Sequence, residues 1–433
     1  MSIPDIQYKR KKLANGLTVL LAPMPKSPTV TAIILFKVGS RYEKEKYAGI
    51  SHFLEHMVFK GNKIYSTPHE VAAVVDALGG SYNAFTSKEF TGFHIKVGAE
   101  FLDIALKWLG ALVTRPLIKA SDTEMERNVI LEEINMYNDT PIMQIGDIFE
   151  ELVFSKTTLG RSVIGTKKSL QNVKNIVLAQ YFRENYFPAN AVLVLAGNLG
   201  RLDSMFRKLS HGDNFKFSPF EKKPISRIIK KAAKIKEKVK IVFKKTDQTH
   251  LILGAETFSY FDKRRYALAV LSTIMGGSMS SWAFTEIREK RGLAYYVRSS
   301  TDLHQDTGSY SINAGLNNNK LELAIKEIIK LYKRIRTKPV TPKELKRAKD
   351  HLIGGTLLER ETSSDIAFIL ASEIATRETI TPLSKEVKII KSISRGDIKK
   401  IAEEFFAPEK LQLAMIGPWG VADKDRFVKL LKS

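Results

Sequence analysis

Three polar residues in the segment GISHFLEHMVFKG (residues 49–61) have the types and the spacing that metal-dependent hydrolysis requires. His52 and His56 are four positions apart, and Glu55 directly precedes the second histidine. On a helix, both imidazoles share one face and the carboxylate lies beside them. Such a pair can bind one divalent ion, and Zn²⁺ is the expected one, with Zn–N distances of ~2.0–2.1 Å. The adjacent carboxylate can deprotonate an attacking water. The alternative is a pair of hydrogen-bonded core histidines, but no other pair among the eight histidines has this spacing.

A third ligand is expected from the segment EMERNVILEEINMY (residues 124–137), because the chain has no cysteine. Glu126 and Glu133 are seven positions apart and therefore share one helix face. We predict that this face is buried, where a free carboxylate is costly and a metal-bound one is not. Glu132 has more polar neighbours than Glu133. We therefore predict Glu133 as the ligand, with Glu126 as a supporting group that hydrogen-bonds a ligand. The apolar residues expected on the buried face are Val129, Ile130, Met136 and Tyr137.

The elements that must position these residues occur twice along the chain. Each half begins with strand-like segments and a helix, continues with an alternating strand, and ends with long amphipathic helices. This order predicts an α+β fold of two homologous domains, each a largely antiparallel sheet flanked by helices. We place an N-terminal zinc domain at 1–210, a basic linker at 211–237 and a C-terminal domain at 238–433. Only the first half contains the His-x-x-Glu-His motif.

Composition limits the classes of function. With 433 residues and 44% hydrophobic residues, the chain can form two sizeable cores. No secretory signal and no apolar run of ~20 residues is visible, which predicts a soluble, cytoplasmic protein without a membrane span. The net charge is +23, and residues 222–245 contain eleven Lys or Arg and one Glu. This stretch could bind nucleic acid, but apart from Phe243 it lacks interleaved aromatic residues, and it contains no nucleic-acid motif, so a solvated linker is favoured.

The motif and several further segments resemble the inverzincin metallopeptidases, the pitrilysin/insulysin family that includes mitochondrial processing peptidase. The resemblance covers essentially the whole chain. Beyond HFLEHMVFKG it includes the four segments GGSYNAFTSKEFTGFHIKV, ERNVILEEINMYNDTP, FPANAVLVLAGN and FTEIREKRGLAYYV. The segment GGSMSSW departs from the family pattern at Ser278 and Trp282. The resemblance implies one zinc ion per chain bound by His52, His56 and Glu133, with Glu55 as general base and Glu126 as support.

The same resemblance implies how a substrate is bound. Asn83, Ala84 and Phe85 match the family's sheet edge, where an extended peptide adds as a further strand inside a closed chamber. Arg288 and Tyr295 match the pair that holds the substrate carbonyl and stabilises the oxyanion. Arg291 and Tyr296 lie nearby and are less favoured for that role.

The expected activity is zinc-dependent endopeptidase cleavage of peptides or unfolded segments. Because the zinc motif and the Arg/Tyr segment occur once each and in different halves, we expect a homodimer whose sites are shared between chains. The alternative is a non-catalytic, peptide-holding or structural subunit. Relatives of that kind lose ligands or the base, and this chain retains all of them.

Overall fold

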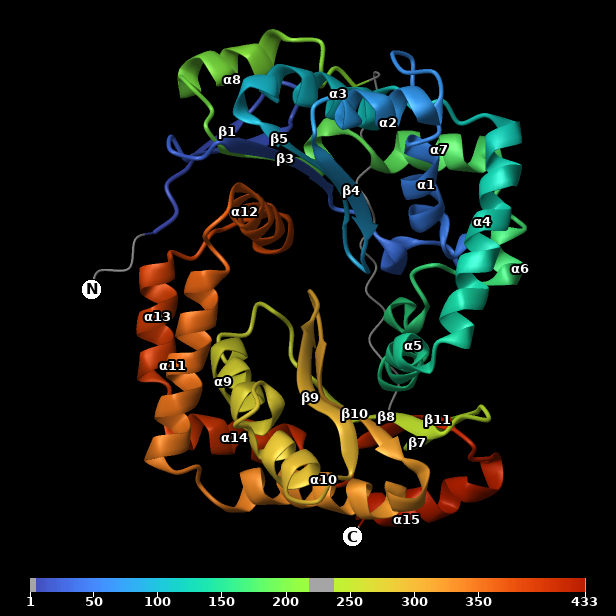
Figure 1. Ribbon diagram of the computed structural model, residues 1–433, viewed down its shortest axis with the longest axis vertical. Coiled ribbons are helices and arrows are strands. Elements are labelled where there is room, and N and C mark those ends of the chain that lie inside the picture. Colours follow the sequence, from blue (N-terminus) through green and yellow to red (C-terminus); the bar gives the residue numbers. More distant parts are fainter. Residues whose placement is uncertain (1–4, 218–236, 433) are drawn as a thin grey trace. The chain divides into compact units, whose positions relative to one another are not determined.

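The computed structural model describes residues 5–217 and 237–432 and forms two compact units (Figure 1). Unit 1 contains the described parts of residues 1–135, 161–228 and 358–383. Unit 2 contains the described parts of 136–160, 229–357 and 384–433. Most of the expected basic linker, residues 218–236, lies outside the described residues. The domain boundaries given above therefore stay a prediction.

Unit 1 is built on a mixed sheet of six strands. Strands β2 and β6 pair in parallel, and the other neighbours pair antiparallel. Both edges are formed by short strands, β1 and β4. The order across the sheet is β1 (Lys9–Lys12), β2 (Thr18–Pro23), β6 (Ala191–Gly197), β3 (Thr29–Phe36), β5 (Thr91–Gly98) and β4 (Ser81–Thr86).

Helices cover both faces of this sheet. One face packs against helices that include α1, α2 and α3, as Figure 1 shows. The other face packs against α12 (Ser363–Arg377), which comes from far along the chain and contributes Ile366, Leu370 and Ile374 to a separate core. The helices on the first face or at its border are α1 (Ile50–Val58), α2 (Pro68–Asp76), α3 (Leu102–Thr114), α4 (Ala120–Asp139), α6 (Lys167–Leu170), α7 (Asn175–Asn185) and α8 (Leu202–His211).

Unit 2 repeats this plan with a five-stranded sheet. Its order is β7 (Val239–Phe243), β11 (Gln412–Gly417), β8 (Gln248–Thr257), β10 (Gly308–Asn317) and β9 (Ala294–Leu303). Helix α5 (Pro141–Val153) packs on one face of β8 and β11. The larger core and its surroundings include α9 (Arg265–Gly276), the π-helical segment η6 (Phe284–Glu289), α10 (Leu321–Thr337), α11 (Pro342–Leu358), α13 (Leu383–Ser392), α14 (Arg395–Phe405) and α15 (Lys424–Lys432).

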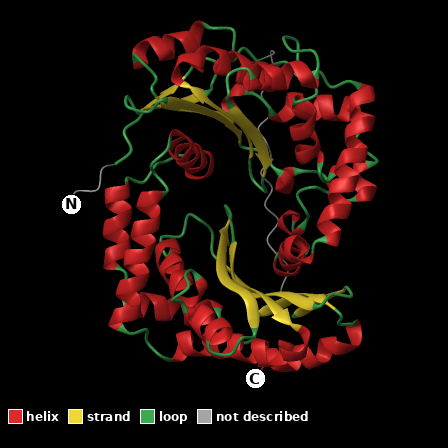
Figure 2. Cartoon of the chain, in the orientation of Figure 1, coloured by secondary structure: helices red, strands yellow, loops and turns green. Residues whose placement is uncertain are grey.

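The two sheets have the same topology, which explains the repeated sequence pattern. Apart from the additional edge strand β1 in unit 1, the first strand of each unit pairs in parallel with the last, and the second, fourth and third strands follow in that order. Figure 2 shows the strands of each unit as one curved sheet bordered by helices. The predicted α+β class with two similar, largely antiparallel sheets is confirmed.

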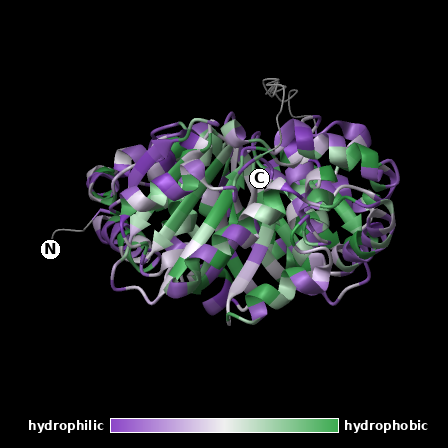
Figure 3. Ribbon diagram, turned by 90° about the horizontal axis from the view of Figure 1, so that it is seen from above, coloured by the Kyte–Doolittle hydropathy of each residue, from purple (hydrophilic) through white to green (hydrophobic). Residues whose placement is uncertain are grey.

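The central strands of the sheets are mostly hydrophobic, and most helices have both polar and apolar residues (Figure 3). All seven residues of β6 are buried. Such continuous burial requires helices on both faces of the sheet, and α12 supplies the second cover in unit 1. Among the described helices, none is long and apolar enough to cross a bilayer.

Candidate active site

Helix α1 is fixed at its N-terminus by a buried carboxylate and a glycine. Glu43 accepts hydrogen bonds from the backbone N–H groups of Gly49 (2.7 Å) and Ser51 (2.8 Å), two donors that a helix N-terminus leaves without intrahelical partners. Gly49 has a φ of 93°, and a Cβ there would lie 2.6 Å from the carbonyl oxygen of Ile164. A glycine is therefore required at this position. Burial raises the pKa of Glu43 to about 7, although its backbone hydrogen bonds and the charge of Arg161 oppose this rise.

The structure brings His52, His56 and Glu133 together. The two Nε2 atoms are 3.3 Å apart, and Oε2 of Glu133 lies 3.6 Å from Nε2 of His52 and 3.7 Å from Nε2 of His56. Ligands bound at about 2.1 Å to a tetrahedral ion are ~3.4 Å apart, so this triangle has the dimensions of a zinc site. Oε2 of Glu133 is buried and has no hydrogen-bond partner, which is costly unless a cation compensates it. The three residues therefore fit a zinc ion.

The pKa shifts of His52, His56 and Glu133 agree with a role of these residues as metal ligands. Burial lowers the pKa of His52 to about 3, helped by the neighbouring His56, so its imidazole is neutral as a ligand must be. Burial also acts to lower the pKa of His56, but the hydrogen bond and charge of Glu126 outweigh it and the net direction is upward. Burial raises the pKa of Glu133. A metal ion would replace the proton that His56 and Glu133 otherwise tend to hold.

Glu126 lies where the sequence placed it, behind one of the histidines. Its Oε1 accepts a hydrogen bond from Nδ1 of His56 at 2.7 Å, which leaves Nε2 of that ring as the atom facing the cluster. Lys60 forms an ion pair with its other oxygen. Burial acts to raise the pKa of Glu126, but the bonds and charges of His56 and Lys60 outweigh it, so the pKa is lowered and the group is a carboxylate.

One expectation about α4 is wrong. Val129 and Met136 were predicted on the buried face, but they are 52% and 50% exposed. The buried residues of α4 instead include Glu126, Ile130 and Ile134. At about 100° per residue, Val129 lies about 100° from Ile130 and about 140° from Ile134 around the helix axis, so it points away from the buried stripe. Glu132 is exposed, and Glu133 is half-buried beside the histidines.

Glu55 has a partner that the sequence did not reveal. Its Oε2 accepts a hydrogen bond of 2.7 Å from the hydroxyl of Thr86, the last residue of β4. Burial raises the pKa of Glu55, and this hydrogen bond opposes the rise. The interaction joins residues 31 positions apart, so only the packing of α1 against β4 could show it.

Asn83, Ala84 and Phe85 lie in β4, which forms one edge of the sheet in unit 1. Their antiparallel partners in β5 are His94, Phe93 and Gly92. An edge strand leaves one row of backbone N–H and C=O groups unpaired within its sheet. These groups are the ones that an extended peptide can pair with.

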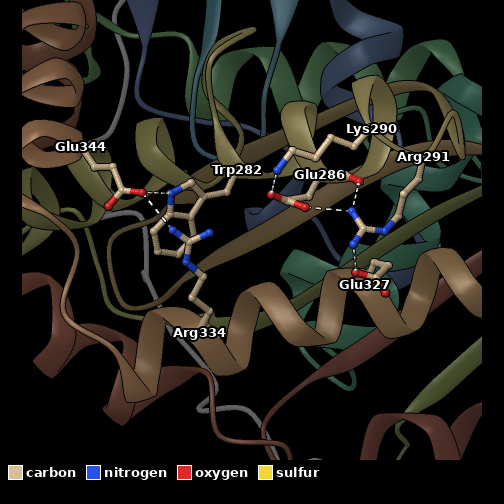
Figure 4. A network of polar contacts seen from close by, with 7 residues as sticks. All are labelled: Trp282, Glu286, Lys290, Arg291, Glu327, Arg334 and Glu344. Atoms are coloured by element: carbon tan, nitrogen blue, oxygen red, sulfur yellow. Dashed lines mark hydrogen bonds and ion pairs between the residues drawn. The ribbon is translucent and has the colours of Figure 1, made fainter.

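The side chains of Arg288 and Tyr295 make fewer polar contacts within the fold than those of their neighbours Arg291 and Tyr296. Tyr295 is 75% exposed, whereas Tyr296 contacts His250 through a hydrogen bond of 3.0 Å. Arg291 forms ion pairs with Glu286 and Glu327, as Figure 4 shows. Arg288 lies over the ring of Phe284, and no ion pair of its guanidinium occurs within the described residues. The side chains of Arg288 and Tyr295 are thus less constrained by contacts within the fold than those of Arg291 and Tyr296.

Trp282, where this chain departs from the family pattern, has a structural role. Its side chain is 6% exposed, and its Nε1 donates to Glu344 at 2.7 Å. The guanidinium of Arg334 lies 3.7 Å from its ring centroid and donates to the same carboxylate (Figure 4). This cluster holds the start of the helical segment that carries Arg288.

Comparisons with known proteins agree with the fold. The sequence profile of insulinase (peptidase family M16) matches residues 18–167, and that of the peptidase M16 inactive domain matches residues 176–352. The chain is 32% identical over 413 residues to YmxG of Bacillus subtilis, named as an uncharacterized zinc protease, covering 95% of this chain and 98% of the relative. An uncharacterized zinc protease of Rickettsia felis is 33% identical over 418 residues, with coverage of 95% and 98%.

Solved structures show the same architecture. A protease from Helicobacter pylori superposes with a TM-score of 0.90 at 25% identity, covering 96% of this chain and 100% of that one. A chain of complex III2 from Candida albicans, 16% identical with a TM-score of 0.81 and coverage of 98% and 99%, shares the fold. The class defined here is the two-domain, insulinase-type peptidase scaffold. The chain belongs to peptidase family M16. The family and the names of its relatives support a zinc protease function.

Proposed function

We propose that this chain is a zinc-dependent endopeptidase that hydrolyses peptides or unfolded segments bound as an added β-strand in a closed chamber. The observation that carries this proposal is the convergence of Nε2 of His52, Nε2 of His56 and Oε2 of Glu133 within 3.7 Å of one another, with Glu55 on the same helix. A zinc ion bound by these three residues would supply Lewis-acid polarisation of the reacting groups.

The chain's own residues account for the proton transfers. Glu55 takes a proton from the attacking water as its oxygen bonds to the scissile carbonyl carbon, and it delivers that proton to the amine nitrogen as the C–N bond breaks. Arg288 and Tyr295 donate to the oxygen that gains negative charge in the tetrahedral intermediate. The outer edge of β4 at Asn83–Phe85, with which no further strand of the sheet pairs, holds the substrate backbone, so sequence demand on the peptide is weak.

Zinc content and base substitution test this function together. The purified chain should bind about one zinc per chain, a chelator should abolish cleavage of an unstructured peptide, and Zn²⁺ should restore it. Glu55→Gln should retain zinc and lose at least about 100-fold in kcat, because the base is not a ligand. Full activity in metal-free protein would refute the assignment. Complete inactivity of the zinc-loaded wild-type chain would instead favour the non-catalytic, peptide-holding subunit.

We further propose that the active form is a homodimer in which each zinc site is completed by the partner's Arg/Tyr segment. The support is that the zinc motif and the segment with Arg288 and Tyr295 occur once each, in different units. A Glu55→Gln chain and a Tyr295→Phe chain should each be nearly inactive alone. After subunit exchange in an equimolar mixture, half of the dimers contain one chain of each variant, and each of these dimers has one intact site. Activity should therefore recover to about a quarter of wild type. No recovery despite confirmed subunit exchange would refute the sharing of sites.

A further inference from the structure

The strand proposed to hold the substrate also touches the proposed general base. Thr86 ends β4, directly after Asn83–Phe85, and its hydroxyl donates to Oε2 of Glu55 at 2.7 Å. Within the described residues, the Glu55 carboxylate accepts no other hydrogen bond. Its second oxygen, Oε1, is thus left to take a proton while Oε2 is held.

The pleat of β4 explains why the hydroxyl points at α1. Side chains along a strand alternate between faces, so Tyr82, Ala84 and Thr86 share one face. Tyr82 and Ala84 pack into the core that contains α1, whereas Phe85 packs into the separate core with α12. The pairing of Thr86 with Thr91 in β5 fixes this register. A slip of one residue would turn the hydroxyl away from Glu55.

We propose that Thr86 is a positioning residue, whose hydroxyl sets the Glu55 carboxylate relative to a peptide paired along β4. This inference rests on the proposed function, because it takes Glu55 as the base and β4 as the substrate strand. Strand β4 then positions the scissile peptide through its backbone and the Glu55 carboxylate through the Thr86 hydroxyl. The hydrogen bond matters when the proton is transferred, so its loss lowers kcat and leaves peptide binding unchanged.

Thr86→Val removes the hydroxyl and keeps the β-branched shape that suits a strand. We expect kcat for peptide cleavage to fall about 10- to 100-fold, as for a catalytic group displaced by ~1 Å. Three other quantities should stay within about threefold of wild type. They are KM, the zinc affinity measured by chelator competition, and the affinity of the metal-free protein for a labelled peptide, measured by fluorescence anisotropy. Thr86→Ser keeps the donor and should retain most of the activity.

The matched control is Thr91→Val, the same change at the residue paired with Thr86. Thr91 donates to the carbonyl of Val38 inside the sheet and does not contact Glu55. Thr91→Val should lower the melting temperature and leave kcat unchanged. The inference is overturned if Thr86→Val keeps wild-type kcat, if both valine variants lose activity equally, or if Thr86→Ser is as poor as Thr86→Val. A zinc-loaded wild-type chain without peptidase activity would instead overturn the proposed function, and this inference with it.

Discussion

Replacing Glu43 by glutamine should change how the stability of this protein depends on pH. Burial raises the pKa of Glu43 from 4.5 to about 7 in the folded protein. The folded state therefore holds the proton more tightly than the unfolded state, so the stabilisation is fully present below pH 4.5 and is lost as the pH rises through 7. The difference, 7 − 4.5 = 2.5, corresponds to about 3 kcal/mol at about 1.36 kcal/mol per pKa unit.

Glutamine has the shape of the protonated side chain but does not titrate. The free energy of unfolding of the wild type minus that of Glu43→Gln should thus fall by about 3 kcal/mol between about pH 4 and pH 8. Urea unfolding followed by circular dichroism, at equal zinc content, measures this difference, and groups that titrate alike in both proteins cancel. Glu45→Gln makes the same change at an exposed position nearby and should leave stability within about 0.5 kcal/mol of wild type.

A difference that stays flat or rises with pH would refute the reasoning. It would mean that the hydrogen bonds from Gly49 and Ser51, with the positive charge of Arg161, outweigh burial at Glu43. In that case the ionised carboxylate would stabilise the start of α1 at neutral pH.

Three further predictions concern ligands and substrate contacts. Glu133→Gln should lose most zinc affinity in chelator competition, whereas Glu132→Gln, exposed on the same helix, should keep it; equal losses would contradict the choice of helix face. Glu126→Gln should weaken zinc binding about 10- to 100-fold in the same assay, because a ligand imidazole loses its carboxylate acceptor; unchanged affinity would remove its supporting role. Arg288→Gln should lower kcat with no change in melting temperature. Arg291→Gln should lower the melting temperature slightly and leave kcat unchanged, because it breaks partly exposed ion pairs with Glu286 and Glu327; the opposite pattern would exchange the roles of the two arginines.

The local features of the site could be predicted from the sequence. The spacing of His52, Glu55 and His56 fixes their relation on any helix, since 3.6 residues make one turn. The seven-residue step from Glu126 to Glu133 fixes their shared face in the same way. The repeated order of strands and helices indicated two sheets of one topology, because alternation and helix-ending signals are local properties of the chain.

Contacts between distant segments were decided only by the tertiary structure. The chain pattern did not indicate that α12 covers the sheet of unit 1 or that α5 belongs to unit 2, since an amphipathic helix does not specify which apolar face it meets. The exposure of Val129 likewise depends on what surrounds α4 and not on its hydropathy. The hydrogen bond from Thr86 to Glu55 exists because the pleat and register of β4 aim one hydroxyl at α1. Sequence spacing placed the reactive groups on their helices, and packing between elements decided which partners hold them.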